Sequence, residues 1–297
     1  GIGKNCGDLP IANDYDKQAY IMDLKTREVE AITKDFDPSI EDLDWNRADG
    51  NIYLRVSEAD EVHVYCYSPK AKTMKQLPLE TPVTSTFALP NESASVAVYT
   101  GQDDSHAGAA YIYNMKKGTS LLVADPMKEE LEEIELGETH EWNFKSVDGT
   151  LITGRYCLPP AFDAQKTYPM IVYYYGGTTP TTKGCLNYYC AQLLASRGYV
   201  VYVIQPSGTI GFGQEFSARH VNAWGKWTAD DIIESEGTKV LWELHHNLFT
   251  HYYVMEIGGV VPKMYNMKQL ELDILEYNDD YGVNHVFKRV EEPDLIN

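Results

Sequence analysis

Basic residues are scarce in this sequence: 25 lysines and arginines stand against 44 aspartates and glutamates, which gives a net charge of −19. Nucleic acids and anionic membranes are bound through clustered lysines and arginines, so neither is an expected partner. Long apolar runs are missing too, since none approaches the roughly 20 residues that span a bilayer. The chain also begins at Gly1 without a charged and then apolar leader. We therefore expect no membrane span and no signal peptide in it.

Cysteine is also sparse. The five cysteines show no C-x-x-C spacing, and their odd number leaves at least one unpaired. They are Cys6, Cys66, Cys157, Cys185 and Cys190. We interpret them as small apolar side chains of the core, and nothing in their pattern predicts a metal or a cofactor.

The chain does contain enough apolar sequence for a real core. It has 297 residues, of which 43% are hydrophobic and 12% aromatic. This composition is typical of a globular protein, and the length suits one large domain or two modest ones.

The stretch from residue 168 to 219 organises the rest of the chain. Ile171–Tyr175 is a short apolar and aromatic run, which predicts a strand buried on both faces. The apolar residues of one helical face follow: Leu186, Cys190, Leu193 and Leu194. Gly198 is expected to end this helix, and Tyr199–Ile204 to form a second buried strand. Two strands joined by a helix make a βαβ unit and indicate a doubly wound, mostly parallel sheet covered by helices.

Residues 1–137 follow another pattern, with short alternating strands between polar turns. Three segments can be laid over one another with Asp23, Ser68 and Asn114 in register, at offsets of 45 and 46 residues. A repeat of this length made of short strands is the signature of propeller blades. About three blades fit before residue 137, fewer than a closed ring needs. An open β-sheet or a sandwich is the alternative.

Two local signals lie at the end of these repeats. The acidic segment 127–138 is interpreted as a solvated connector, with a docking segment as the alternative. Asp148 and Gly149 then stand between two alternating runs, which predicts a hairpin.

Four polar residues after the second strand invite a chemical interpretation. Ser207 lies in QPSGTIG, which lacks the G-x-S-x-G context of a nucleophile, and we interpret it as a turn serine. Thr228, Asp230 and Asp231 are expected to cap the next helix, because hydroxyls and carboxylates stabilise helix N-termini. A metal site there would need convergent partners that the sequence does not show.

Several linked motifs carry a resemblance to a known family. They are EWNFKSVDGTLITGRYCLPPAFD, YPMIVYYYGG, GYVVYVIQPSGTIGFGQEF and ARHVNAWGKWTADDI. Over residues 141–234 they resemble the start of the α/β-hydrolase domain of the prolyl oligopeptidase family of serine peptidases, in its dipeptidyl and tripeptidyl peptidase branch. In that family a propeller precedes the hydrolase domain. The resemblance implies a partial β-propeller at residues 1–137, the N-terminal part of an α/β hydrolase at 138–240, and an unassigned segment at 241–297.

The resemblance also implies an activity, the serine-type hydrolysis of peptides with release of short N-terminal units after proline. Tyr175 stands where the family places a tyrosine whose hydroxyl binds the oxyanion of the tetrahedral intermediate. A packed strand aromatic is the structural alternative for this residue. Peptides are the implied substrates, and no cofactor or metal is implied. A periplasmic or secreted location and a homodimer are compatible with the resemblance.

The nucleophile of the family is not found. A G-x-S-x-G-G elbow is expected roughly 25 to 30 residues after Asp231, where the chain reads YYVMEIGGVVP at 252–262. No serine occurs there, and none follows Ser235. The remaining triad types are available as His285, Asp273, Asp279 and Asp280. Without a nucleophile they have nothing to activate.

The last part of the sequence departs from the family. His245, His246 and His251 lack the spacing of the H-E-x-x-H zinc motif, and we interpret them as polar residues at a helix end. Residues 235–297 are divergent sequence, a junction with another reading frame, or part of an unrelated protein. We expect a chain that keeps Tyr175 but is catalytically silent. The alternatives are a non-catalytic binding or scaffolding protein and an esterase on the same fold.

Overall fold

The computed structural model describes residues 2–5, 13–90, 92–146, 148–184, 190–223 and 225–236, together with short strands between 255 and 288. The chain forms two compact units, Gly1–Thr238 and Lys239–Asn297. The predicted domain boundaries at residues 137 and 240 stay predictions. None of the helices in the described part is long and apolar enough to cross a membrane.

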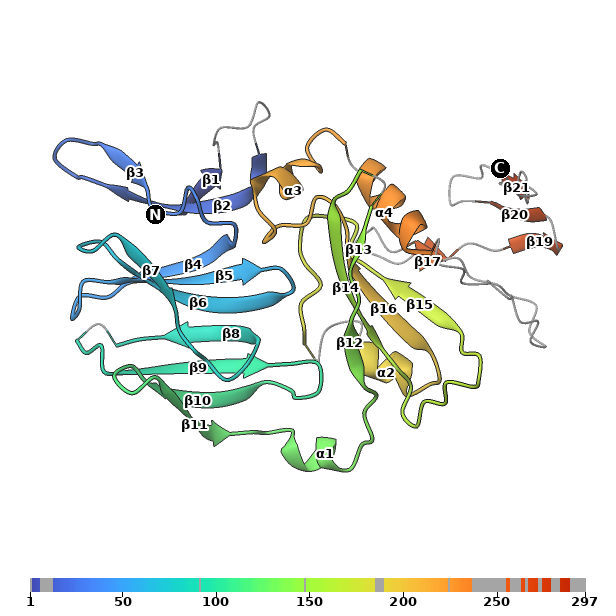
Figure 1. The fold of residues 1–297 in the computed structure, drawn as a ribbon, viewed down its shortest axis with the longest axis horizontal. Helices are drawn as coiled ribbons and strands as arrows, with labels where there is room; N and C mark the ends of the chain where they lie inside the picture. Colours follow the sequence, from blue (N-terminus) through green and yellow to red (C-terminus); the bar gives the residue numbers. More distant parts are fainter. Residues whose placement is uncertain are drawn as a thin grey trace. The chain divides into compact units, whose positions relative to one another are not determined.

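Two four-stranded antiparallel meanders build most of the first half of the chain (Figure 1). The first consists of β4 (Ser39–Trp45), β5 (Ile52–Glu58), β6 (Glu61–Ser68) and β7 (Thr73–Gln76). The second consists of β8 (Val83–Ala88), β9 (Val96–Gln102), β10 (Ala109–Asn114) and β11 (Thr119–Ala124). A single parallel bridge, between Val62 and Val83, joins them. A three-stranded sheet precedes them and contains β1 (Ile2–Asn5), β2 (Asn13–Met22) and β3 (Val29–Ala31).

The predicted repeat is confirmed by the turns that close the last hairpin of each sheet. The amide of Arg27 donates to the carbonyl of Asp23, that of Lys72 to Ser68, and that of Gly118 to Asn114. The three donors share a left-handed backbone, with φ of 65°, 54° and 66°. The side-chain oxygen at the first position of each turn also accepts backbone N–H groups, as Asx and ST turns do.

The meanders pack on one another through their faces. One core cluster joins Tyr53 and Val64 of the first meander to Ala97, Tyr99 and Tyr113 of the second. Another joins the first meander to the preceding sheet, through Ala19, Ile40, Ile52, Leu54, Val56 and Tyr67. Successive four-stranded antiparallel units stacked face to face are the architecture of propeller blades.

A second sheet follows the acidic connector, which forms the short exposed helix α1 (Lys128–Glu132). Its order is β12 (Thr139–Glu141), β14 (Leu151–Cys157), β16 (Val200–Gln205) and β15 (Met170–Tyr173), with β13 (Phe144–Lys145) paired to β14. β15 and β16 are parallel, as the βαβ interpretation predicts. β14 runs antiparallel to β16, so the described part of this sheet is mixed. The expected hairpin is present, with Gly149 at φ 85°.

The helix between β15 and β16 differs from the prediction. α2 spans only Ala191–Ala195, and its buried residues are Gln192 and Ala195. Leu193, expected on the core face, is 55% exposed. Gln192 takes the inner position because its amide exchanges two hydrogen bonds with the backbone of Gly137, at 2.8 and 2.9 Å. Gly198 ends the helical turn as predicted, with φ 91°.

Two further helices complete the first unit. α3 spans Gln214–Ala218 and α4 spans Lys226–Glu236. The second unit contains β17 (Met255–Glu256) paired with β18 (Lys263–Met264), and the antiparallel sheet of β19 (Met267–Glu271), β20 (Ile274–Asn278) and β21 (Asn284–Lys288).

Candidate active site

Tyr175 lies just beyond the carboxyl end of β15. The strand ends at Tyr173 and not at Tyr175 as the sequence predicts. The side chain of Tyr175 is 49% exposed, so the interpretation as a packed strand aromatic is wrong. A Cβ on Gly177 would stand 2.5 Å from the ring of Tyr175, which makes glycine a requirement of this close approach. The phenol is thus presented at the end of a parallel strand.

The loop after Tyr175, residues 176–184, is tied to the sheet beneath it. Thr181 donates its N–H to Oε1 of Gln205 at 3.0 Å and accepts from Nε2 of the same residue at 2.7 Å. Gln205 is the last residue of β16 and is 1% exposed. The amide of Ile210 donates to the carbonyl of Thr178 at 2.8 Å. These bonds give the loop a defined path across the ends of β15 and β16.

The same loop contacts the propeller-like half of the unit. The amide of Lys183 donates to the carbonyl of Asp60 at 2.8 Å. The Lys183 ammonium lies 2.6 Å from Glu61 and 3.4 Å from Glu141. The His63 imidazole and this ammonium hold the pKa of Glu61 at about 2, below its usual value, although partial burial opposes the shift.

Arg155 lies at the centre of this junction. It belongs to β14, and its side chain is 5% exposed. Its guanidinium bonds the carboxylate of Asp60 at 2.8 Å and the carbonyls of Thr181 and Thr182 at 3.0 and 2.8 Å. A carboxylate oxygen of Asp104 lies 3.2 Å from its Nε. Burial raises the pKa of Asp104, although the charge of Arg155 acts in the opposite direction.

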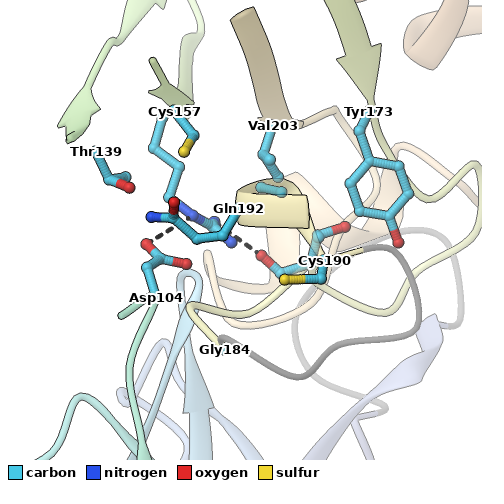
Figure 2. Close-up of a pocket in the computed structure, with 11 residues that line it drawn as sticks. Asp104, Thr139, Cys157, Tyr173, Gly184, Cys190, Gln192 and Val203 are labelled. Carbon is cyan, nitrogen blue, oxygen red and sulfur yellow. Dashed lines mark hydrogen bonds and ion pairs between the residues drawn. The ribbon is translucent and has the colours of Figure 1, made fainter. Parts of the chain in front are cut away.

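A small pocket opens beside this junction (Figure 2). Its labelled lining residues are Asp104, Thr139, Cys157, Tyr173, Gly184, Cys190, Gln192 and Val203. Cys157 is buried and burial raises the pKa of its thiol to about 11, so it is protonated at neutral pH. Cys66 and Cys157 are free thiols, and Cys6 and Cys185 lie outside the described residues.

Ser207 is a turn residue, as predicted. It is 2% exposed, and its N–H donates to the carboxylate of Asp231 at 2.6 Å. The capping role predicted for Asp231 is therefore wrong. α4 begins at Lys226, two residues earlier than expected, so Thr228 and Asp231 fall inside the helix. Thr228 instead donates to the carbonyl of Ser207 at 3.4 Å, and the helix is pinned to the loop after β16.

Part of the predicted chemistry falls outside the described residues. This holds for His245, His246, His251, Gly258 and Gly259, and for Asp273, Asp279 and Asp280. His285 belongs to β21, but its side chain is not described. Within the residues that are described, no three His, Cys, Asp or Glu side chains converge as metal ligands would. The sequence reasoning missed Arg155, Asp60 and Asp104, which no motif connects.

Comparison with known proteins agrees with this geometry. A family model described as the prolyl oligopeptidase family matches residues 187–242. Dipeptidyl-peptidase 5 of Porphyromonas gingivalis is 24% identical over 220 residues, which cover 73% of this chain and 31% of the relative. The corresponding protein of Aspergillus oryzae is also 24% identical, over 72% of this chain and 30% of its own length. In these comparisons the chain is similar to the prolyl oligopeptidase family.

Solved structures of the prolyl oligopeptidase family support the fold. Pyrococcus horikoshii acylaminoacyl peptidase superposes with a TM-score of 0.62 at 20% identity, over 74% of this chain and 33% of that one. Dipeptidyl peptidase 4 of Porphyromonas gingivalis gives a TM-score of 0.61 at 20% identity, over 74% and 32%. The fold, an α/β hydrolase preceded by a partial propeller, is confirmed. The chain spans about a third of the length of these relatives.

Proposed function

We propose that this chain is part of a serine peptidase that hydrolyses peptides and releases short N-terminal units after proline. The observation that carries the proposal is the place of Tyr175. Its half-exposed phenol stands at the carboxyl end of a parallel strand, the edge at which open α/β sheets bind ligands. In acyl transfer a hydroxyl donor at such an edge stabilises the negative charge that develops on the carbonyl oxygen.

The test is a kinetic comparison of the protein expressed from the full gene of its natural source with the Tyr175→Phe variant prepared in the same way. The substrates are peptide coumarylamides with proline or alanine before the scissile bond. We expect kcat for the proline substrates to fall about 10² to 10³-fold with little change in KM, because one oxyanion donor contributes about this much. Tyr199→Phe is the matched control, since Tyr199 is partly buried and packs against the core cluster that contains Ala195 of α2. An unchanged kcat in Tyr175→Phe would contradict the assignment.

We also propose that the 297-residue chain is catalytically silent. No serine follows Ser235, and the serines described between β15 and α4 have structural roles. Ser196 donates to the carbonyl of Leu193, Ser207 forms the turn held by Asp231, and Ser217 is buried in a hydrogen-bonded cluster. A triad needs a hydroxyl that is exposed beside a histidine base. This arrangement favours a binding role for the chain by itself.

The esterase alternative is distinguished with the same preparations. Turnover of p-nitrophenyl esters without turnover of any peptide coumarylamide would favour an esterase. Turnover of the peptide coumarylamides by the 297-residue chain would support a peptidase. It would contradict the proposal that this chain is catalytically silent.

A further inference from the structure

We propose that Arg155 is a positioning residue that holds the loop of Tyr175 in place from both halves of the first unit. This inference rests on the proposed function only where it concerns the effect of Arg155 on catalysis. The contacts of Arg155 with the loop do not depend on that function. The loop runs from Gly176 to Gly184, directly after Tyr175, and Arg155 bonds two of its carbonyls.

The contacts of Arg155 use every nitrogen of its guanidinium. Nη1 bonds Asp60 and the carbonyl of Thr181, Nη2 bonds the carbonyl of Thr182, and Nε faces Asp104. A planar guanidinium offers its donors in a fixed fork, which an ammonium cannot reproduce. The group therefore fixes the direction of the loop backbone as well as its distance from β14.

The two carboxylates come from different blades. Asp60 lies in the turn between β5 and β6, and Asp104 lies between β9 and β10. Arg155 thus joins two adjacent meanders, a hydrolase strand and the loop of Tyr175 at one buried point. Asp104, labelled among the pocket residues in Figure 2, has a carboxylate oxygen 3.2 Å from Nε of Arg155. A shift between the blades and the hydrolase sheet is transmitted through this point to Tyr175.

Both cations at this point are paired with carboxylates. Arg155 faces Asp60 and Asp104. Lys183 pairs with Asp60, Glu61 and Glu141, and its backbone amide donates to the carbonyl of Asp60. A buried cation that loses one partner leaves the other charges uncompensated, which is costly in a low-dielectric site. The loop is therefore held in one arrangement, since its displacement would strip Arg155 of two acceptors at once.

The test uses the full chain, with Arg155→Lys as the variant and Arg55→Lys as the matched control. Arg55, on β5, instead pairs with Glu41 on β4. Hydrogen exchange is followed at the amides of Thr181 and Lys183, both of which are donors in the loop. We expect exchange about tenfold faster or more in Arg155→Lys and no change in Arg55→Lys.

A second readout separates positioning of Tyr175 from a merely structural role. A fluorotyrosine placed at residue 175 is expected to shift or broaden its fluorine resonance in Arg155→Lys and to keep it in Arg55→Lys. Should Arg155→Lys fail to fold, Asp60→Asn carries the test, with exchange at Thr181 expected to rise several-fold. Unchanged exchange, or a resonance that does not move while exchange rises, would overturn the proposal. Neither readout uses a substrate, so an inactive protein leaves the test intact.

Discussion

Asn13, on β2, donates a hydrogen bond to the hydroxyl of Ser217, on α3, across 204 residues of sequence. The nitrogen and oxygen are 2.7 Å apart, and both side chains are buried. The same hydroxyl donates to the carboxylate of Asp16 at 3.1 Å. One serine therefore links the propeller-like strands to a helix of the hydrolase-like part.

Removal of this hydroxyl should destabilise the first unit. Ser217→Ala removes one buried hydrogen bond from Asn13 and one from Asp16, and the loss of a partner from a buried polar group costs about 1–3 kcal/mol. We expect a loss of about this size in the free energy of unfolding, measured by urea denaturation. Ser196→Ala is the control, because Ser196 is exposed, and its loss should stay within about 0.5 kcal/mol. Equal effects of the two substitutions would contradict the role of Ser217.

Acid should weaken the junction through Glu61. Its pKa is about 2 in the folded chain, so protons bind more readily to the unfolded chain. The stability that Glu61 contributes is present above the usual pKa of a glutamate and is lost as the pH falls toward 2. Asp104 acts in the opposite direction, because burial raises its pKa. The variant Glu61→Gln isolates the contribution of Glu61.

The measurement is the urea midpoint at pH 5 and at pH 3 in the parent and in Glu61→Gln. We expect the variant to lose less stability between these pH values than the parent does. Glu215→Gln, at an exposed position of α3, should follow the parent. Parallel curves for the parent and Glu61→Gln would show that this carboxylate does not contribute.

Gly177 should control the position of the Tyr175 ring. A Cβ at residue 177 would lie 2.5 Å from that ring, whereas one at Gly176 meets only Tyr174, at 3.8 Å. We expect Gly177→Ala to move the fluorine resonance of a fluorotyrosine at residue 175 and Gly176→Ala to leave it in place. Because the ring is half exposed and can rotate away, the fold stability should change little. A shift in both variants, or in neither, would contradict the contact.

The third blade turn should depend on its glycine. Gly118 has φ 66°, and a Cβ there meets only ordinary contacts, so the cost of an alanine is conformational. We expect Gly118→Ala to lower the free energy of unfolding by about 1 kcal/mol. Gly108→Ala, where a Cβ would meet no neighbour, should have no such cost. Arg27 and Lys72 occupy the equivalent positions in the other two turns. Replacing either with glycine should therefore leave the free energy of unfolding unchanged or raise it.

The local elements of the fold could be predicted from the sequence, because they depend on neighbouring residues. The turns at Asp23, Ser68 and Asn114 repeat at regular offsets, and Gly198 ends α2 where the apolar pattern ends. The βαβ unit follows from two apolar runs around a helix. These signals are carried by spacing, which a sequence displays directly.

The tertiary contacts could not be predicted, because their partners are far apart in sequence. Asp231 has the position of a helix cap by pattern, yet it accepts a hydrogen bond from Ser207, 24 residues earlier. Leu193 fits an apolar helical face, but the pairing of Gln192 with Gly137 turns it outward. Arg155 gives no sign in the sequence that it pairs with Asp60, 95 residues away.

Covalent labelling of the 297-residue chain by a fluorophosphonate probe tests the account most directly. Adducts are located by peptide mapping, with dipeptidyl-peptidase 5 of Porphyromonas gingivalis labelled in parallel. We predict that no serine of this chain is modified, because Ser196, Ser207 and Ser217 take part in structural hydrogen bonds and no serine follows Ser235. A stoichiometric adduct on any serine of the chain, Ser207 included, would contradict this and show that the chain contains its own nucleophile.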